Sequence, residues 1–212
     1  MQSIQLLLAS RTRFLYAMGK ERLKMTGIIL FRAQPFHNGH LAQIRRAIED
    51  MWKLDSDLYV IIGSADKSGT KRNPIPIDVR LDLVKGSLEE AFNSFQLKHI
   101  HVVPLNDLSD EANNTHSWGE YLYNKMCEYT GDTDFIFYYS DKPEIALSWF
   151  DSTTISHIYF RFLPRVENLC ATSVRISLAR LDHIDRMALE TDLPPYVYSK
   201  IDELHNYIVN AR

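Results

Sequence analysis

Short apolar segments alternate with segments of helical spacing along most of this 212-residue sequence, and the alternation limits how the chain can fold. Residues 26–32, TGIILFR, form an apolar run of strand-like composition. Residues 39–52, GHLAQIRRAIEDMW, then place apolar side chains three and four positions apart, as on the buried face of a helix. Residues 57–64, DLYVIIGS, return to a nearly continuous apolar run, which suits a strand buried on both faces. This pattern predicts a parallel sheet covered by helices.

The second half of the sequence continues the pattern. Helical spacing returns at residues 77–92 and 117–129, and a Thr-Ser pair suited to capping opens a further helix at 170–181. The last helix is expected at residues 194–208, beginning on two prolines. Further strands are predicted at residues 98–105, 134–140 and 157–162. The expected fold is an α/β, Rossmann-like doubly wound parallel sheet of about five strands with a C-terminal helical segment.

The composition is that of a folded globular protein, with 45% hydrophobic and 24% charged residues. A net charge of −3 argues against a general nucleic-acid binder, because duplex binding needs a concentrated basic face. No apolar run approaches the roughly 20 residues of a membrane helix, so we expect no membrane partner. The two cysteines, Cys127 and Cys170, are too few for a disulfide framework and lack the spacing of a zinc site. We therefore expect a cytoplasmic protein.

The first 24 residues differ in charge from the rest, because they hold five basic residues against one acidic residue. We expect residues 1–24 to be an N-terminal extension, either an accessory helix or sequence upstream of a start at Met25. A targeting peptide is the third alternative. No internal repeat, low-complexity tract or Gly/Ser linker divides the remainder. Residues 25–212 are therefore predicted to form one domain.

Two histidines, His37 and His40, stand where the first predicted strand turns into the first predicted helix. If that helix begins near Asn38, both imidazoles lie over its first turn, beside unpaired backbone N–H groups and the positive end of the helix dipole. A strand, a tight turn that contains Gly39 and a helix N-terminus together bind phosphate. The residues alone indicate a site for a nucleotide phosphate chain, whose charge would favour protonated imidazoles. Structural or surface histidines and a metal-binding H-x-x-H pair remain the alternatives.

The segment ILFRAQPFHNGHL at 29–41 resembles the GRFQPFHxGH signature of the H-x-G-H nucleotidyltransferases, most closely that of the archaeal-type nicotinamide mononucleotide (NMN) adenylyltransferases. Trp118, in NNTHSWGEYL, falls where this family carries a tryptophan that stacks on the nicotinamide ring. The resemblance runs from about residue 26 to the C-terminal helix and makes 25–212 a nucleotidyltransferase domain. Three other blocks keep the family's order: GSADKSGTKRNPIPIDVR at 63–80, YYSDKP at 138–143 and CATSVR at 170–175.

The resemblance implies ATP-dependent transfer of an adenylyl group to NMN, which forms NAD and pyrophosphate with Mg²⁺ as the cofactor. The catalytic roles would fall to His37, His40 and Arg175, with no residue assigned as a protein ligand to a metal. ATP would be bound by Arg32, Gln34, Gly39, Thr172 and Ser173, and the mononucleotide by Trp118, Asn73, Arg80 and Asp141.

The sequence departs from the family pattern in the first motif, where Phe31 replaces a glycine and Ala33 replaces a phenylalanine. The two changes compensate if one aromatic ring has moved two positions along the same strand face; otherwise Phe31 crowds the ATP site. Cys170 replaces a serine, and Asp141 changes the polarity where the second substrate is expected. Two alternatives are therefore kept: a cytidylyltransferase-type enzyme acting on another phosphorylated substrate, and a nucleotide-binding module without turnover. Assembly into a homo-oligomer is left open.

Overall fold

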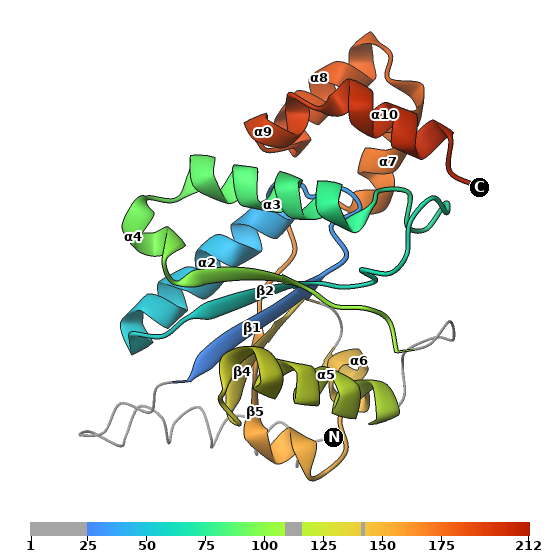
Figure 1. Cartoon of the computed structure of the whole chain (residues 1–212). Coiled ribbons are helices and arrows are strands. Elements are labelled where there is room, and N and C mark those ends of the chain that lie inside the picture. Colours follow the sequence, from blue (N-terminus) through green and yellow to red (C-terminus); the bar gives the residue numbers. More distant parts are fainter. Residues whose placement is uncertain (1–24, 109–115, 141–142) are drawn as a thin grey trace.

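The computed structural model of the protein describes residues 25–108, 116–140 and 143–212. Within these ranges it contains a five-stranded, all-parallel sheet with the strand order β3-β2-β1-β4-β5 (Figure 1). Each strand lies inside one of the five predicted segments, so the predicted Rossmann-like fold is confirmed. The strands are β1 (Thr26–Phe31), β2 (Leu58–Ile62), β3 (Ile100–Pro104), β4 (Phe135–Tyr139) and β5 (Ile158–Phe162).

Helices cover both faces of the sheet (Figure 1). From β1 the chain adds β2 and β3 on one side, and then returns to add β4 and β5 on the other side of β1. Because crossover connections between parallel strands are right-handed, the helices before β3 and the helices after it lie on opposite faces of the sheet. One face carries α2 (Asn38–Leu54), α3 (Ile77–Ala91) and the short α4 (Ser94–Leu97). The other face carries α5 (His116–Thr130), α6 (Pro143–Ser148) and a 3₁₀ turn, η1 (Thr154–His157).

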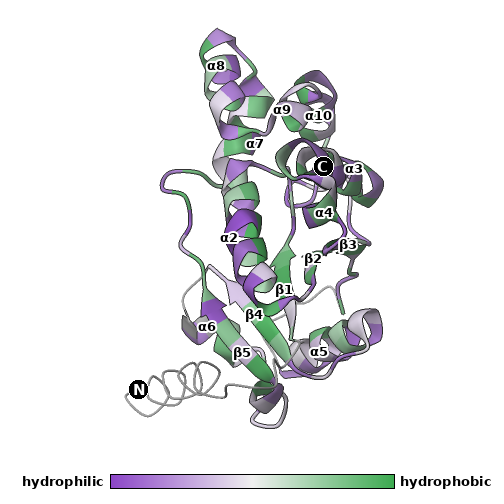
Figure 2. Ribbon diagram, turned by 90° about the vertical axis from the view of Figure 1, so that its left-hand side faces the viewer, coloured by the Kyte–Doolittle hydropathy of each residue, from purple (hydrophilic) through white to green (hydrophobic). Residues whose placement is uncertain are grey.

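Successive residues of the central strands enter two separate hydrophobic clusters. Ile29 and Val60 join the cluster under α2 and α3, whereas Ile28 and Ile61 join the cluster under α5. All four side chains are at most 2% exposed. The strands are largely hydrophobic in Figure 2, while α2 presents many hydrophilic residues away from the sheet. Burial on both faces explains why these strands are continuous apolar runs in the sequence.

The C-terminal helical segment contains more helices than predicted. The helix expected at 170–181 is confirmed as α7 (Ala171–Arg180). The helix expected at 194–208 is divided at residues 199–200, so the prediction of a single helix was wrong. An additional helix was not predicted, because two of its apolar side chains, Ile184 and Met187, are 76% and 60% exposed and obscure its buried face. These elements are α8 (His183–Asp192), α9 (Pro195–Tyr198) and α10 (Ile201–Val209).

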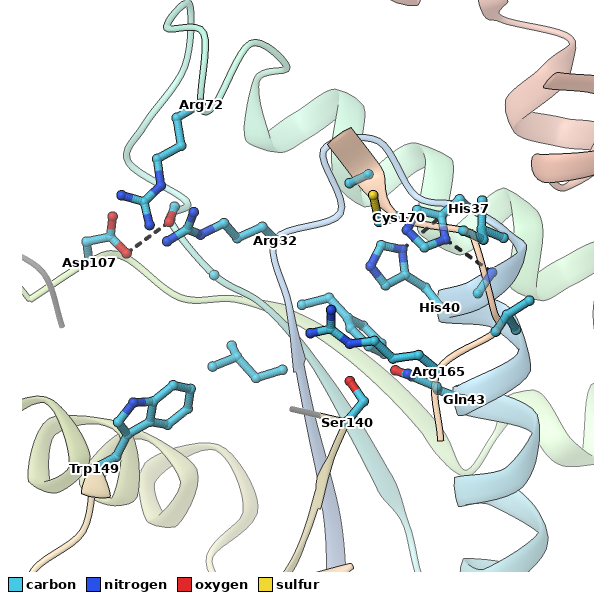
Figure 3. Close-up of a pocket in the computed structure, with 18 of the residues that line it drawn as sticks. Arg32, His37, His40, Gln43, Arg72, Asp107, Ser140, Trp149, Arg165 and Cys170 are labelled. Carbon is cyan, nitrogen blue, oxygen red and sulfur yellow. Dashed lines mark hydrogen bonds between the residues drawn. The ribbon is translucent and has the colours of Figure 1, made fainter. Parts of the chain in front are cut away.

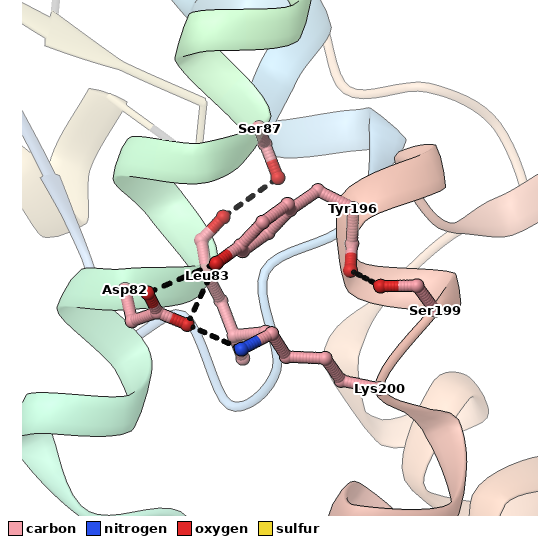
Figure 4. Close-up of polar contacts among 6 residues, drawn as sticks. All are labelled: Asp82, Leu83, Ser87, Tyr196, Ser199 and Lys200. Atoms are coloured by element: carbon pink, nitrogen blue, oxygen red, sulfur yellow. Dashed lines mark hydrogen bonds and ion pairs between the residues drawn. The ribbon is translucent and has the colours of Figure 1, made fainter.

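The C-terminal helices dock on α3 through Tyr196 (Figure 4). A side-chain atom at Gly86 would lie 2.3 Å from the Tyr196 ring, so glycine allows this close approach. The Tyr196 hydroxyl donates to Asp82 at 3.0 Å, and Lys200 Nζ forms an ion pair with the same carboxylate at 2.9 Å. The helical segment is therefore held at a defined position against the sheet layer.

Residues 1–24 lie outside the described ranges, so the expected N-terminal extension and the division into one domain stay predictions. In the part of the chain that the structure describes, no helix combines the length and the apolar character needed to cross a membrane.

Candidate functional site

A cavity of about 500 Å³ opens at the carboxyl ends of β1 and its neighbours (Figure 3). β1 lies between β2 and β4. The segment that follows β1 crosses one face of the sheet, and the segment that follows β4 crosses the other face. Parallel α/β sheets bind their ligands at such a switch point. The lining comes from the end of β1, the turn from β1 to α2 and the first turns of α2, the segments after β2, β3 and β4, the segment that leads into α7, and two tryptophans on the α5 side. The polar and aromatic lining residues are Phe31, Arg32, His37, His40, Gln43, Ser64, Arg72, Asp107, Trp118, Ser140, Trp149, Arg165 and Cys170.

His37 and His40 cap the start of α2 by exchanging hydrogen bonds with its first turn. The Gly39 backbone N–H donates to His37 Nδ1 at 3.1 Å, and the His37 backbone N–H donates to His40 Nδ1 at 3.3 Å. The two rings stack with centroids 3.8 Å apart, and the Phe31 ring lies 4.6 Å from that of His40. Both rings are therefore fixed by packing as well as by hydrogen bonds.

Gly39 is required by this stacking. A Cβ atom at position 39 would lie 2.9 Å from His37 Cε1 and from His37 Nδ1, closer than real Cβ atoms approach. The H-x-G-H spacing thus has a local explanation: one histidine caps the helix, the glycine leaves room for its ring, and the second histidine caps in return.

Both imidazoles are neutral near pH 7. Burial lowers the pKa of His37 to about 4, and the nearby Arg165 guanidinium lowers it further. The pKa of His40 lies well below its usual value, mainly through burial and then through the charges of His37 and Arg165. Since each Nδ1 accepts a backbone N–H, the ring proton belongs on Nε2. The site therefore offers two neutral N–H donors in the absence of ligand, rather than the protonated imidazoles expected for a phosphate-bound state.

The start of α7 reaches the same cavity from the far end of the sequence. Cys170 caps this helix: its Sγ accepts the Ser173 backbone N–H at 3.4 Å, and Ser173 Oγ accepts the Cys170 backbone N–H at 3.3 Å. Arg175 Nη1 donates to the Gln34 carbonyl oxygen at 2.7 Å. This contact joins α7 directly to the turn between β1 and α2. Two helix N-termini, each with its positive dipole end, therefore converge on one cavity.

Guanidinium groups supply the formal positive charge. Arg32, Arg72 and Arg165 line the cavity, and Arg175 lies at its edge. Burial lowers the pKa of Arg32, and the charges of Arg72 and Arg175 lower it further. The three guanidinium groups therefore lie close enough to repel one another. Asp107 is the one carboxylate among the described lining residues, and its Oδ1 accepts the Ser64 hydroxyl at 3.0 Å (Figure 3). The described lining therefore carries three guanidinium cations and one carboxylate, a balance that favours an anionic ligand.

Arg80, Gln34 and Asn73 lie outside the cavity lining, and the side chains of Arg80 and Gln34 bind backbone groups. Arg80 is fully buried and donates to the carbonyl oxygens of Arg32, Gly63 and Ser64 at 2.8 to 2.9 Å. The Gln34 amide bonds the backbone N–H and carbonyl of Ile75. Asn73 is buried in a turn, with its backbone N–H bonded to Thr70 Oγ1 at 3.1 Å. Arg80 and Gln34 hold the ends of β1 and β2 and the loop that follows β2.

The remaining predicted residues divide between the lining and its edge. Arg32, His37, Gly39, His40 and Trp118 line the cavity, and Trp118 is 5% exposed. Thr172, Ser173 and Arg175 form the first turn of α7 beside it, where Thr172 Oγ1 accepts from Arg175 Nη2 at 3.3 Å. Asp141 lies outside the described residues.

Sequence reasoning missed Gln43, Arg72, Asp107, Ser140, Trp149 and Arg165. Gln43 is one helical turn beyond Gly39, so helical periodicity could have found it. Ser140 follows β4 directly and Asp107 follows β3 by three residues, so the rule that ligands bind at strand carboxyl ends could have found both. Arg72 and Arg165 lie in irregular segments, where no periodicity marks a side chain's direction.

The two substitutions in the first motif do not exchange places on one strand face. β1 ends at Phe31, and Ala33 adopts a left-handed backbone with φ of 52°. The alternation of side chains therefore stops before position 33, which rules out compensation by a shift of the aromatic ring along one strand face. Phe31 lines the cavity, but its ring packs against His40 and thereby helps to hold it.

The described residues contain no group of three or more His, Cys, Asp or Glu side chains that could hold a metal ion.

Comparison with known proteins gives a consistent class. A family model described as cytidylyltransferase-like matches residues 32–129. The nicotinamide-nucleotide adenylyltransferase of Haloarcula marismortui is 27% identical over 85% of this chain and 82% of its own length. A crystal structure of a bifunctional NMN adenylyltransferase/ADP ribose pyrophosphatase from Francisella tularensis matches 88% of this chain and 52% of that one, with a TM-score of 0.67 and 15% identity. The fold is thus that of the Rossmann-like nucleotidyltransferases.

Among named relatives, the sequence similarity is to archaeal NMN adenylyltransferases, so the resemblance expected from the motifs is confirmed. The enzyme of that name from Ignicoccus hospitalis is 32% identical over 77 residues, which are 36% of this chain. The match spans 42% of the length of that relative, less than half.

Proposed function

We propose that the protein transfers the adenylyl group of ATP to NMN and releases pyrophosphate, forming NAD. The observation that carries this proposal is the convergence of two helix N-termini, two neutral imidazoles and three guanidinium groups on one cavity at the switch point of the sheet. A triphosphate is the ligand that such a set of donors fits best. The named relatives are similar to this chain over 36% and 85% of its length.

The reaction needs no protein nucleophile. An oxygen of the NMN 5′-phosphate attacks the α-phosphorus of ATP, the bond from that phosphorus to the bridging oxygen breaks, and pyrophosphate leaves with the electron pair. The attacking phosphate is already an anion, so catalysis consists of positioning and of stabilising charge on the α-phosphate and the leaving group.

The residues divide this work by position. His37 and His40 donate through Nε2–H to the α- and β-phosphates, and Arg32 and Arg72 neutralise the chain from the opposite side of the cavity (Figure 3). Arg175 and Thr172, at the start of α7, bind the β- and γ-phosphate end. Arginine suits these positions because its planar fork grips two oxygens and stays charged.

The mononucleotide would occupy the α5 side of the cavity. Trp118 and Trp149 both line it there, with ring centroids 6.4 Å apart and planes at 78°. A flat heteroaromatic base suits this pair, because it can stack on the face of one ring while the second ring stands edge-on beside it. Asp107 is placed to accept hydrogen bonds from ribose hydroxyls.

Mg²⁺ is the expected cofactor, and the residues present fit it only as a complex with the nucleotide. Mg²⁺ prefers oxygen ligands and usually keeps several waters, and one carboxylate, Asp107, lies among the described lining residues. The phosphates would supply most of its ligands. When bound, Mg²⁺ supplies charge neutralisation on the phosphate oxygens. The Francisella neighbour was solved with AMP and a manganese ion.

Purified protein given ATP, Mg²⁺ and NMN should release pyrophosphate and form NAD, measured by an enzymatic NAD assay. Absence of both products at high protein concentration would remove the proposal. CTP with a panel of phosphorylated alcohols and sugars tests the cytidylyltransferase alternative, which the cytidylyltransferase-like family match favours. Tight ATP binding without pyrophosphate release across all substrates would favour a binding module.

A further inference from the structure

The loop that carries Arg72 is fixed at its base and exposed at its tip. At the base, the Gln34 side chain bonds the backbone of Ile75 at 2.9 and 3.1 Å. At the tip, residues 68–72 are all exposed, and Gly69 has a φ of 70° with open space around it. Arg72 nevertheless reaches from this tip into the cavity. Something must therefore hold the tip if Arg72 is to keep one position.

The last residue of the sequence binds this tip through its backbone. The Arg212 N–H donates to the Gly69 carbonyl oxygen at 2.9 Å, and the Lys71 N–H donates to the Arg212 backbone oxygen at 3.1 Å. The backbone bonds within the tip are longer: Gly69 N–H to Pro74 O at 3.4 Å and Thr70 N–H to Asn73 O at 3.3 Å. Residue 212 thus makes the two shortest backbone hydrogen bonds that the structure gives for residues 68–72. Figure 1 shows the end of the chain beside this loop.

The position of residue 212 is set by the C-terminal helices. Asn210 ends α10 and its N–H bonds the Asn206 carbonyl at 3.3 Å. The Leu204 side chain of α10 is fully buried, and Lys200, just before α10, pairs with Asp82 on α3 (Figure 4). Residue 212 therefore follows closely on a helix that is itself packed against the sheet layer.

We propose that residues 211–212 are a positioning element for the proposed nucleotide site: their backbone holds the tip of the 65–76 loop and thereby keeps Arg72 in the cavity. The inference rests on the proposed function insofar as Arg72 binds the phosphates of ATP. The work is done by main-chain groups, so the identity of the side chain at position 212 does not matter.

Removing this contact should act on binding more than on chemistry. Arg72 would have to be immobilised at the moment ATP binds, at a cost that should weaken ATP binding about threefold to tenfold. The KM for ATP should rise by a similar factor, while kcat changes less, because His37 and His40 stay packed on the other side of the cavity.

The test compares a chain lacking residues 211–212 with the Arg212→Ala variant, which keeps both backbone groups. Amide exchange at Lys71 should become faster in the shortened chain, remain slow in Arg212→Ala, and be unchanged in strands β1 and β2 of both. ATP affinity, measured by calorimetry, should fall only in the shortened chain. In an Arg72→Ala background, removing residues 211–212 should cause no further loss, because residues that act through one another are not additive.

Each other outcome overturns the proposal. Unchanged Lys71 exchange in the shortened chain means that residues 211–212 do not hold the loop, whatever the activity. Faster exchange with unaltered ATP affinity, or an equal further loss in the Arg72→Ala background, means that the loop is held without positioning Arg72. A full-length chain that binds no ATP would overturn the proposed function as well, and that result is separate from the exchange measurement.

Discussion

The two helix N-termini that meet at the cavity differ in how firmly their caps are held. At the start of α2, His37 is 5% exposed and stacks on His40, which packs in turn against two phenylalanines. At the start of α7, Cys170 and Thr172 are exposed. Donors at α2 are thus in place before a ligand arrives, whereas those at α7 have room to adjust. Under the proposed function, substitutions at the start of α2 should therefore lower turnover more than substitutions at the start of α7.

The same contrast appears one residue into each helix. Gly39 and Thr172 both stand two positions after the capping residue, at the second helical position. At Gly39 the His37 ring leaves no room for a side chain, whereas the Thr172 side chain is exposed and its hydroxyl oxygen accepts from Arg175. A cap built from a buried ring constrains its neighbours in sequence, and a cap built from a small exposed side chain does not.

The largest expected effect is on acid stability. His37 has a pKa of about 4 when folded and about 6.5 when unfolded, so between these values the unfolded chain binds a proton that the folded chain does not. Its contribution to stability is complete above pH 6.5 and is lost as the pH falls toward 4. The loss should amount to roughly 3 kcal/mol, because one pKa unit is about 1.4 kcal/mol.

Denaturant unfolding measured from pH 7 to pH 4 checks this prediction against a His37→Asn variant, which keeps an acceptor for the helix cap and does not titrate. The variant should lose less stability over the window. Parallel curves for the two proteins would show that the α2 cap is not held as a buried neutral ring.

His40→Ala should lower turnover by a factor of about 100 or more, as expected when one preorganised donor to a developing charge is lost. His183→Ala is the matched control, because His183 is exposed at the start of α8 and does not line the cavity. Steady-state release of pyrophosphate measures both. Turnover near that of the unmodified chain in His40→Ala would remove α2 from the chemistry.

Gly39→Ala should destabilise the fold by about 1–3 kcal/mol, the usual cost of forcing extra atoms into a packed site. Thr172→Ala, at the equivalent position of α7, should change stability by less than about 0.5 kcal/mol, because the side chain is exposed. The free energy of unfolding in urea gives both values. Equal effects at the two positions would end the distinction between a buried and an exposed cap.

Cys170→Ser should have the smallest effect, less than about twofold on turnover, because serine caps helices well and the position is exposed. The same pyrophosphate assay applies. A tenfold loss would mean that the α7 cap is as demanding as the α2 cap.

Much of the fold follows from residue patterns, because strands buried on both faces and amphipathic helices leave strong signals. All five strands and the helices α2, α3, α5 and α7 lie where those patterns indicated them. The C-terminal segment was predicted less well. The exposed apolar side chains Ile184 and Met187 hide the buried face of α8, and nothing periodic marks the break between α9 and α10.

The candidate site was predicted unevenly for a similar reason. Local motifs located His37 and His40, since capping depends on neighbours in sequence. Arg80 carries the same charge as Arg32, but its side chain is buried and donates to three carbonyl oxygens. Only the packed structure reveals that this side chain points away from the cavity lining. Arg165 has no local signal, because its place at the cavity depends on contacts between distant segments.

A crystal structure of the full chain with ATP tests the central claim most directly. The account predicts density for the β-phosphate within hydrogen-bond distance of Nε2 of His40, with the γ-phosphate end at the first turn of α7 and a guanidinium of Arg32 or Arg72 opposite. A triphosphate bound away from these helix starts, or held at one of them alone, would contradict it.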